Sequence, residues 1–143
     1  MFTEILISAV IATESHGNNL AVGDHGDAVG CLQIHWEVID DVNRVHGTEF
    51  TWPQSAYSRE DSITIFRLWH RIYSPKNATD EQLARNWNGG RNGWKNPNTL
   101  KYWKKVKQCL RALKTGKPLP KPKPWSFPVT LKDGKPYPDE QGN

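Results

Sequence analysis

Apolar residues recur at helical spacing in several separate stretches of the chain, and this periodicity constrains the fold more than any other feature. Residues 17–34 interrupt it, because they are rich in Gly, Asn and Asp, which favour turns and positive φ. We therefore expect a mainly α protein, an α+β arrangement with a small irregular β or loop region near residues 17–34. The predicted helices cover residues 3–15, 34–46, 58–73, 79–90 and a last stretch that begins at Pro97.

Helical spacing also predicts which side chains face the core. The second helix is expected to bury Ile34, Val38, Val42 and Val45, the third Phe66, Trp69 and Tyr73, and the last Trp103, Val106, Leu110 and Leu113. Two pairs have the spacing of a capping box, which marks the start of a helix, namely Ser58 with Asp61 and Thr79 with Gln82. Gly17 and Gly47 are placed to end helices.

The composition changes near residue 116. Seven of the ten prolines fall between Pro118 and Pro138, interleaved with lysines. We expect residues 1–115 to form one domain and residues 116–143 to form an extended, basic, Pro-rich tail.

The charges are distributed unevenly along the chain. Residues 1–90 hold six Lys and Arg against twelve Asp and Glu, whereas residues 91–123 hold eleven Lys and Arg and no acid. The second part of the chain is therefore expected to face an anionic partner, such as a cell-wall polymer, a nucleic acid or a membrane surface.

The two cysteines, Cys31 and Cys109, lie in apolar contexts and are expected to be buried free thiols, with a single bridge as the alternative. The N-terminal stretch carries an acid, Glu4, and no basic region before its apolar run, so it makes a poor signal peptide. No apolar run is long enough for a transmembrane helix. Synthesis in the cytoplasm without a signal peptide is the resulting expectation.

Folding alone does not explain the position of Glu14. It lies in the last turn of the first predicted helix, on the face shared by Ile7, Val10 and Ile11, just before the break at Gly17. Apolar surroundings and the negative end of a helix dipole both disfavour an ionised carboxyl group. A glutamate placed there is suited to donate a proton as a general acid. An exposed helix-end glutamate without function is the alternative interpretation.

Three sequence motifs occur in an order that resembles the lysozyme-like lytic transglycosylases. They are Glu14-Ser15, Gly30-Cys31-Leu32-Gln33-Ile34 and Asn86-Trp87-Asn88-Gly89-Gly90. The stretch from Glu14 to Ile34 is also similar to goose-type lysozyme, and the whole resemblance covers roughly residues 3–110. It implies a lysozyme-like fold with Glu14 as the catalytic acid. It also implies substrate contacts from Gln33, Trp87 and Asn88, and from Ser15, which orients either Glu14 or the substrate.

Two positions depart from the family pattern. Trp87 stands where the family has a tyrosine that hydrogen-bonds near the catalytic acid, and an indole offers an N–H but no hydroxyl. Cys31 stands where the family has a larger apolar residue, which is a milder change because cysteine packs as a small hydrophobe.

The reaction outcome depends on whether a second catalytic carboxylate assists Glu14. Asp24 resembles an acid that goose-type lysozymes carry in this loop. The other candidate acid position of goose-type lysozymes is occupied by His35 here, and Asp27 is a weaker candidate. If Asp24 holds a water opposite Glu14, the resemblance implies an inverting hydrolase. If it points away, the muramoyl 6-hydroxyl attacks instead, and we favour this transglycosylase outcome because the second acid rests on one loop residue. Turn chemistry alone also explains Asp in such a loop.

The expected function is cleavage of the β-1,4 bond between N-acetylmuramic acid and N-acetylglucosamine, with peptidoglycan glycan strands as the partner. No cofactor is implied, and the five histidines show no spacing typical of a metal site. Trp, Tyr and Lys alternate in residues 91–107 in a way that suits single-stranded nucleic acid, but helical spacing places part of this segment in the core, so nucleic-acid binding is disfavoured.

A structural virion or assembly protein with a lysozyme-like domain is the remaining alternative. The tail and the poor signal peptide favour delivery to the bacterial cell wall as a virion component, as a released phage lysin or through a secretion machine. Virion or secretion-machine proteins would then contact residues 116–143.

Overall fold

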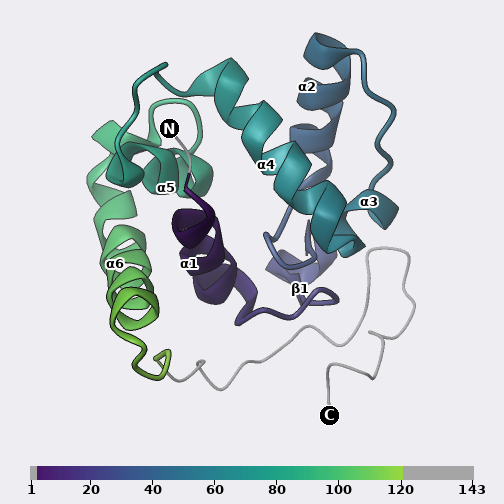
Figure 1. The fold of residues 1–143 in the computed structure, drawn as a ribbon. Helices are drawn as coiled ribbons and strands as arrows, with labels where there is room; N and C mark the ends of the chain where they lie inside the picture. The colour runs from purple at the N-terminus through teal and green to yellow at the C-terminus, as the bar shows by residue number, and fades with distance from the viewer. Residues whose placement is uncertain (1–2, 121–143) are drawn as a thin grey trace. The chain divides into compact units, whose positions relative to one another are not determined.

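The computed structural model describes residues 3–120, which are mostly helical with one small antiparallel sheet, as predicted. The chain divides into two compact units. Of the described residues, 3–13 and 67–120 belong to one unit and 14–66 to the other. Helices α1 (Glu4–Ser15) and α4 (Arg59–Tyr73) each contain residues of both units (Figure 1).

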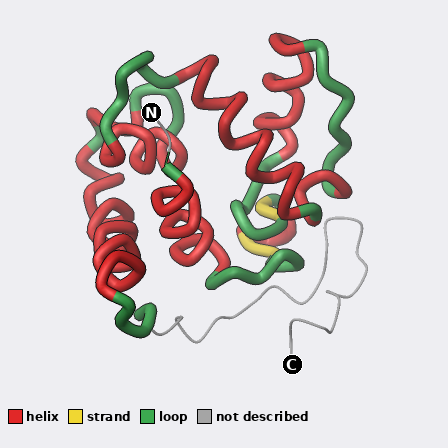
Figure 2. The backbone as a smooth tube through the Cα atoms, in the orientation of Figure 1, coloured by secondary structure: helices red, strands yellow, loops and turns green. Residues whose placement is uncertain are grey.

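The unit of residues 14–66 starts with the end of α1 and continues into a short hairpin. Strand β1 (Val22–Gly23) pairs antiparallel with β2 (Ala28–Val29), and the 3₁₀ helix η1 (Asp24–Gly26) connects them. Figure 2 shows these two strands as the short yellow segments between loops. Helix α2 (Trp36–His46) ends at Gly47 with a left-handed φ of 67°, as predicted, and a short helix, α3 (Gln54–Tyr57), precedes α4.

The unit of residues 3–13 and 67–120 contains the C-terminal helices. Helix α5 (Asp80–Gly89) packs against the 3₁₀ helices η2 (Gly93–Lys95) and η3 (Pro97–Thr99) and against α6 (Leu100–Thr115). The capping box predicted for α5 is confirmed, because the Gln82 N–H donates to Thr79 Oγ1 over 3.1 Å and the Thr79 N–H donates to Gln82 Oε1 over 2.9 Å. At the start of α4, the Asp61 N–H donates to the Ser58 hydroxyl.

Six of the eleven predicted core residues are buried, three are partly exposed, namely Val38, Tyr73 and Trp103, and two are exposed. Val45 is 51% exposed and Leu113 is 37% exposed. Both lie in the last turn of their helices, where a side chain projects beyond the packed part of the helix. Helix α2 starts at Trp36 rather than at residue 34, and its buried side runs through Ile39 and Val42 instead.

Both cysteines are buried and unbridged, as expected. Burial raises the pKa of the Cys31 thiol, and this effect outweighs the opposing influence of Arg59 and Ser62. The Thr13 hydroxyl donates a hydrogen bond to Cys109 Sγ over 3.6 Å. Each thiol therefore belongs to the packing of its own unit.

Gly30 allows the segment after β2 to pass directly against α3. Its φ is +84°, and a Cβ at this position would collide with the carbonyl group of Ala56. Its N–H donates to the Ala21 carbonyl over 2.8 Å. The approach is possible only because residue 30 has no side chain.

Gly30→Ala is therefore expected to lower the free energy of unfolding by about 3 kcal/mol or more, because it combines a left-handed backbone with overlap against main-chain atoms. Gly47→Ala is the matched control, since φ is +67° there but no heavy atom lies within 4 Å of an added Cβ. It should cost about 1 kcal/mol. Urea unfolding followed by circular dichroism measures both variants, and equal midpoints would contradict the role of the Ala56 contact.

Candidate active site

Ser15 joins the end of α1 to the segment that follows the hairpin. Its hydroxyl donates to the Cys31 carbonyl over 2.8 Å, and the residue is only 1% exposed. Glu14, its neighbour, is partly exposed. The burial of Ser15 favours the role of orienting Glu14 over direct contact with a substrate. The chain then leaves the helix through two left-handed residues, His16 and Gly17.

Gln33 uses its side chain to hold its own loop together. Its Nε2 donates to the Ala21 carbonyl over 3.2 Å and to the Gly30 carbonyl over 3.0 Å. Because both amide hydrogens are used in this way, a sugar contact by Gln33 would have to come from its amide oxygen. That oxygen lies against the backbone of Gly23.

Asp24 and His35, the two positions at which the goose-type pattern has acids, contact each other. His35 Nε2 lies 3.0 Å from Asp24 Oδ2, and the two side chains are 41% and 68% exposed. Asp24 and His25 are consecutive left-handed residues with φ of 49° and 57°, and the turn is closed by the Asp27 N–H, which donates to the Asp24 carbonyl. The structure thus places a solvent-accessible carboxylate and imidazole together in the same unit as Glu14. Asp27 is partly exposed in the same turn.

Trp87 and Asn88 lie near the end of α5, in the unit of residues 3–13 and 67–120. The Trp87 ring packs edge-on against Trp69, with centroids 5.3 Å apart, and lies 5.9 Å from the His70 ring. Trp87 is partly exposed and Asn88 is exposed. Helix α5 therefore carries an aromatic ring and an amide at consecutive positions, and both are side chains that suit contact with sugars.

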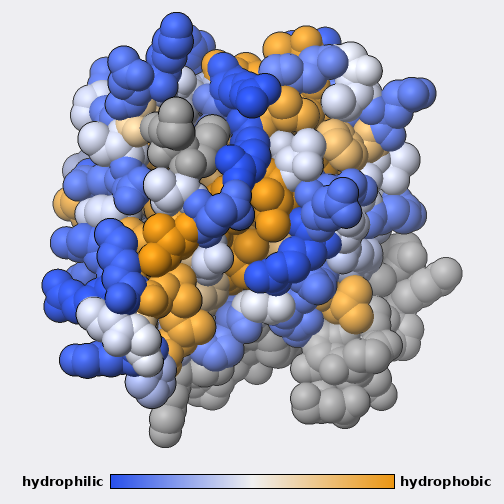
Figure 3. Space-filling model, in the orientation of Figure 1, coloured by the Kyte–Doolittle hydropathy of each residue, from blue (hydrophilic) through white to orange (hydrophobic). Residues whose placement is uncertain are grey.

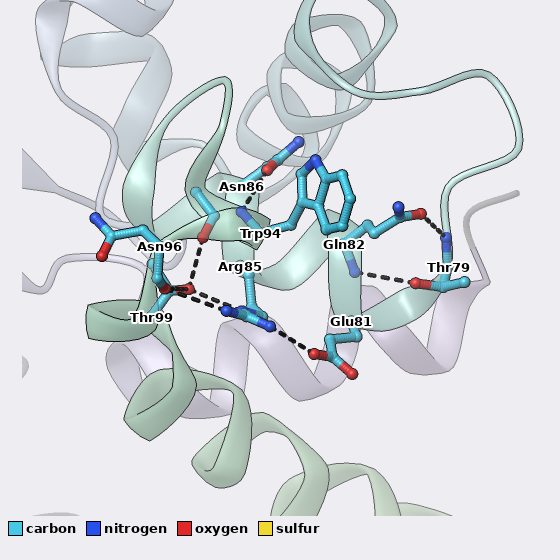
Figure 4. A network of polar contacts seen from close by, with 9 residues as sticks. Thr79, Glu81, Gln82, Arg85, Asn86, Trp94, Asn96 and Thr99 are labelled. Atoms are coloured by element: carbon cyan, nitrogen blue, oxygen red, sulfur yellow. Dashed lines mark hydrogen bonds and ion pairs between the residues drawn. The ribbon is translucent and has the colours of Figure 1, made fainter.

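A polar network around Arg85 holds this end of α5 in place (Figure 4). Arg85 is 8% exposed, forms an ion pair with Glu81 at 2.6 Å and donates from Nε to the Thr99 hydroxyl at 2.8 Å. Asn86, which is fully buried, accepts the Trp94 N–H over 2.9 Å. These bonds tie residues 93–99 to α5. Arg85 was not predicted as a structural partner, although Glu81 and Arg85 have the i, i+4 spacing of a helical ion pair. Asn86 was predicted only as the first residue of the third motif.

His70 is another functional candidate that the sequence analysis missed. It is 2% exposed, and its Nδ1 lies 2.6 Å from Ser74 Oγ. Ser74 Oγ in turn accepts a hydrogen bond from Asn86 Nδ2 over 3.1 Å. Burial lowers the pKa of His70 to about 3, so its imidazole is neutral at pH 7. Its spacing of four residues from Phe66 on α4 was the signal for an inward position.

Within residues 3–120, no group of three or more His, Cys, Asp or Glu side chains is placed to hold a metal ion. The helices of this part of the chain include none that is long and apolar enough to cross a membrane.

Replacing His70 with Gln is expected to flatten the pH dependence of stability. The pKa of His70 is lowered from an ordinary 6.5 to about 3, so unfolding takes up a proton and the wild type loses stability as pH falls from about 6.5 to 3. The slope in that window is up to about 1.4 kcal/mol per pH unit. Urea unfolding at pH 7 and at mildly acidic pH tests this, with exposed His46→Gln as the control. The same acid sensitivity in wild type and His70→Gln would contradict the prediction.

Comparison with known proteins found a solved structure with a similar fold. No protein-family model and no curated protein matches the chain. A chain in the crystal structure of Aeromonas hydrophila PliI in complex with Meretrix lusoria lysozyme shares the fold, with a TM-score of 0.63 and 24% sequence identity. The match covers 73% of this chain and 87% of that chain. At this level of identity the likeness establishes the fold alone.

Proposed function

We propose that this protein cleaves the β-1,4 bond between N-acetylmuramic acid and N-acetylglucosamine in peptidoglycan, with Glu14 as the proton donor. The observation that carries the proposal is the fixed position of Glu14 in the last turn of α1, beside a buried serine whose hydroxyl bonds the Cys31 carbonyl. The order of the three sequence motifs supports it. A chain of this fold occurs in a crystal structure of PliI in complex with a lysozyme, and this context is compatible with a function at peptidoglycan.

Glu14 would protonate the glycosidic oxygen as the sugar develops oxocarbenium character. In the lytic transglycosylase that we propose, the muramoyl 6-hydroxyl then attacks, and Glu14 serves in turn as the base. This route needs no second catalytic group. The alternative is a hydrolase in which Asp24 holds the attacking water, and the accessible contact between Asp24 and His35 favours it specifically.

The charge of α6 supports an acidic polymer as the partner. Five of its exposed cationic side chains recur every three or four residues, and these are Lys101, Lys104, Lys107, Arg111 and Lys114. Figure 3 shows hydrophilic side chains along the outer side of this helix. Like charges at this spacing repel one another, so the face gains free energy from an anionic partner. Peptidoglycan supplies carboxylates.

Delivery to the wall by a virion, as a released phage lysin or by a secretion machine belongs to the same proposal. The contact expected for the tail lies mostly outside the described residues, because the structure describes the chain only to residue 120.

Glu14→Gln is expected to lower the rate of peptidoglycan cleavage by a factor of about 10² to 10⁴, the usual contribution of a general acid. The measurement is the loss of turbidity of a purified peptidoglycan suspension. Glu49→Gln is the matched control, because Glu49 is an exposed carboxylate of the same unit. Equal rates for wild type and Glu14→Gln, or no cleavage by either, would refute the proposal.

Two further arms of this assay separate the alternatives. Mass spectrometry of the products distinguishes anhydro-muramoyl ends, which are lighter by one water, from hydrolysed ends. The second arm adds a lysozyme to the reaction, because the crystal structure that contains a chain of this fold is a complex of PliI with a lysozyme. A chain that slows the lysozyme and cleaves nothing itself would have a lysozyme-binding function instead.

Replacing Lys104, Lys107 and Arg111 together with Gln is expected to weaken binding to insoluble peptidoglycan about threefold to tenfold at low salt, and to reduce its salt dependence. Cosedimentation at low and high salt measures this. Glu14→Gln should bind as wild type does, and Arg44→Gln, an exposed cation on α2, is the charge control. An unchanged salt dependence in the triple variant would exclude α6 as the binding face.

A further inference from the structure

A pocket lies at the end of α4 and the start of α5, apart from the residues that sequence analysis assigned to the active site. Its volume is about 340 Å³. Its polar lining consists of His70, Arg71, Ser74 and Lys76, and its apolar lining consists of Pro75, Ala78 and Leu83. All seven residues belong to the unit of residues 3–13 and 67–120, so the pocket is formed within one unit.

The pocket is positively charged. Arg71 and Lys76 are exposed, and no Asp or Glu is among the lining residues. The acids that follow closely in the sequence are Asp80 and Glu81, and Glu81 is already paired with Arg85 at 2.6 Å. The two cations at the pocket are therefore available to an anionic ligand.

The wall of the pocket is held in place before any ligand arrives. Ser74 Oγ lies 2.6 Å from His70 Nδ1 and accepts a hydrogen bond from Asn86 Nδ2 over 3.1 Å. The Ser74 N–H donates to the His70 carbonyl over 2.9 Å, and the Ala78 N–H donates to the Pro75 carbonyl over 3.1 Å. A preformed site of this kind spends little free energy on ordering when a ligand binds.

We propose that this pocket binds the carboxylate end of a short peptide with small apolar side chains, namely the stem peptide of peptidoglycan. The carboxylate would lie between the Arg71 guanidinium and the Lys76 ammonium groups, and methyl side chains would contact Pro75, Ala78 and Leu83. The assignment of the peptide to peptidoglycan rests on the proposed function. The anionic and apolar character expected of the ligand follows from the lining residues alone.

Size and lining select a peptide end over other anions. A volume of about 340 Å³ is at the lower end of the range of small-molecule sites, roughly 300–1,000 Å³. A bare phosphate or sulfate would leave the three apolar side chains without a partner. A nucleotide would require a stacking platform, and no Phe, Tyr or Trp lines the pocket.

Two interactions connect the pocket to the predicted sugar contacts, and the first is the approach of the His70 ring to within 5.9 Å of the Trp87 ring. The second is a hydrogen bond at the pocket wall. Asn86 Nδ2 donates to Ser74 at the pocket wall, and Trp87 and Asn88 follow Asn86 directly on α5. Helix α5 would thus contribute Leu83 to the peptide pocket and carry the predicted sugar contacts, Trp87 and Asn88, near its end. The protein would then bind glycan strands that carry stem peptides more tightly than glycan strands without them.

The test is isothermal titration of the full-length protein with N-acetyl-D-alanyl-D-alanine and with the same dipeptide as its C-terminal amide. We expect the carboxylate form to bind and the amide to bind at least about tenfold more weakly, since it lacks the charge. Arg71→Gln and Lys76→Gln should each weaken binding about twofold to fivefold, and together about tenfold. Arg91→Gln, an exposed cation of the same unit outside both the pocket and α6, should leave dipeptide binding unchanged.

Three results would overturn the inference. They are no binding of the acid dipeptide, equal binding of acid and amide, or displacement of the dipeptide by acetate at equal concentration, which would show a site for simple anions. Both exposed side chains can be replaced without loss of core packing, and circular dichroism checks this. The dipeptide assay involves no glycan cleavage, so its failure is separate from that of the proposed function. Normal dependence of cleavage on Glu14 without dipeptide binding rejects only the pocket, and dipeptide binding without that dependence rejects only the glycosidase.

Discussion

The hydrogen bond from the Ser15 hydroxyl to the Cys31 carbonyl is the contact on which the candidate active site depends. It joins the end of α1 to the segment after the hairpin, sixteen residues further along the chain. The bond is buried, so leaving either group unpaired would cost about 1–3 kcal/mol. The residue next to Ser15 is Glu14, and the segment beyond Cys31 leads to Gln33 and His35. A buried bond between a side-chain hydroxyl and a main-chain carbonyl therefore helps to position these residues within their unit.

Backbone strain gathers around the same contact. Within residues 3–120, the non-glycine residues with left-handed φ are His16, Asp24, His25 and Gln33. Each such conformation costs of the order of 1–3 kcal/mol and persists only where surrounding contacts enforce it. Here those contacts are the two bonds from the Gln33 amide, the β1–β2 pairing and the close approach of Gly30 to Ala56. Strain confined to the segment that holds the candidate residues is what a preorganised site requires.

The sequence predicted those features whose causes are local. The capping box of Thr79 and Gln82, the end of α2 at Gly47 and the break in periodicity at residues 17–34 all depend on neighbours within a few residues. Helix α3 was missed because four residues are too few to show a period. The burial of Arg85 and Asn86 depends on partners from residues 93–99, and the contact of Asp24 with His35 depends on the hairpin, so neither follows from spacing alone.

Under the function that we propose, the tryptophan at position 87 removes one influence that the family resemblance implies for Glu14. An indole has no hydroxyl, so the tyrosine contact of the family cannot form in the same way, and the Trp87 ring is instead packed on Trp69 and His70. Glu14, Asp24 and His35 all belong to the unit of residues 14–66. In that unit, Asp24 and His35 form a carboxylate–imidazole pair that water can reach. A hydrolase needs such access, whereas attack by the muramoyl 6-hydroxyl requires water to be kept away from the reacting carbon. Under the function that we propose, the choice of nucleophile would therefore depend on whether a bound glycan covers the Asp24–His35 pair.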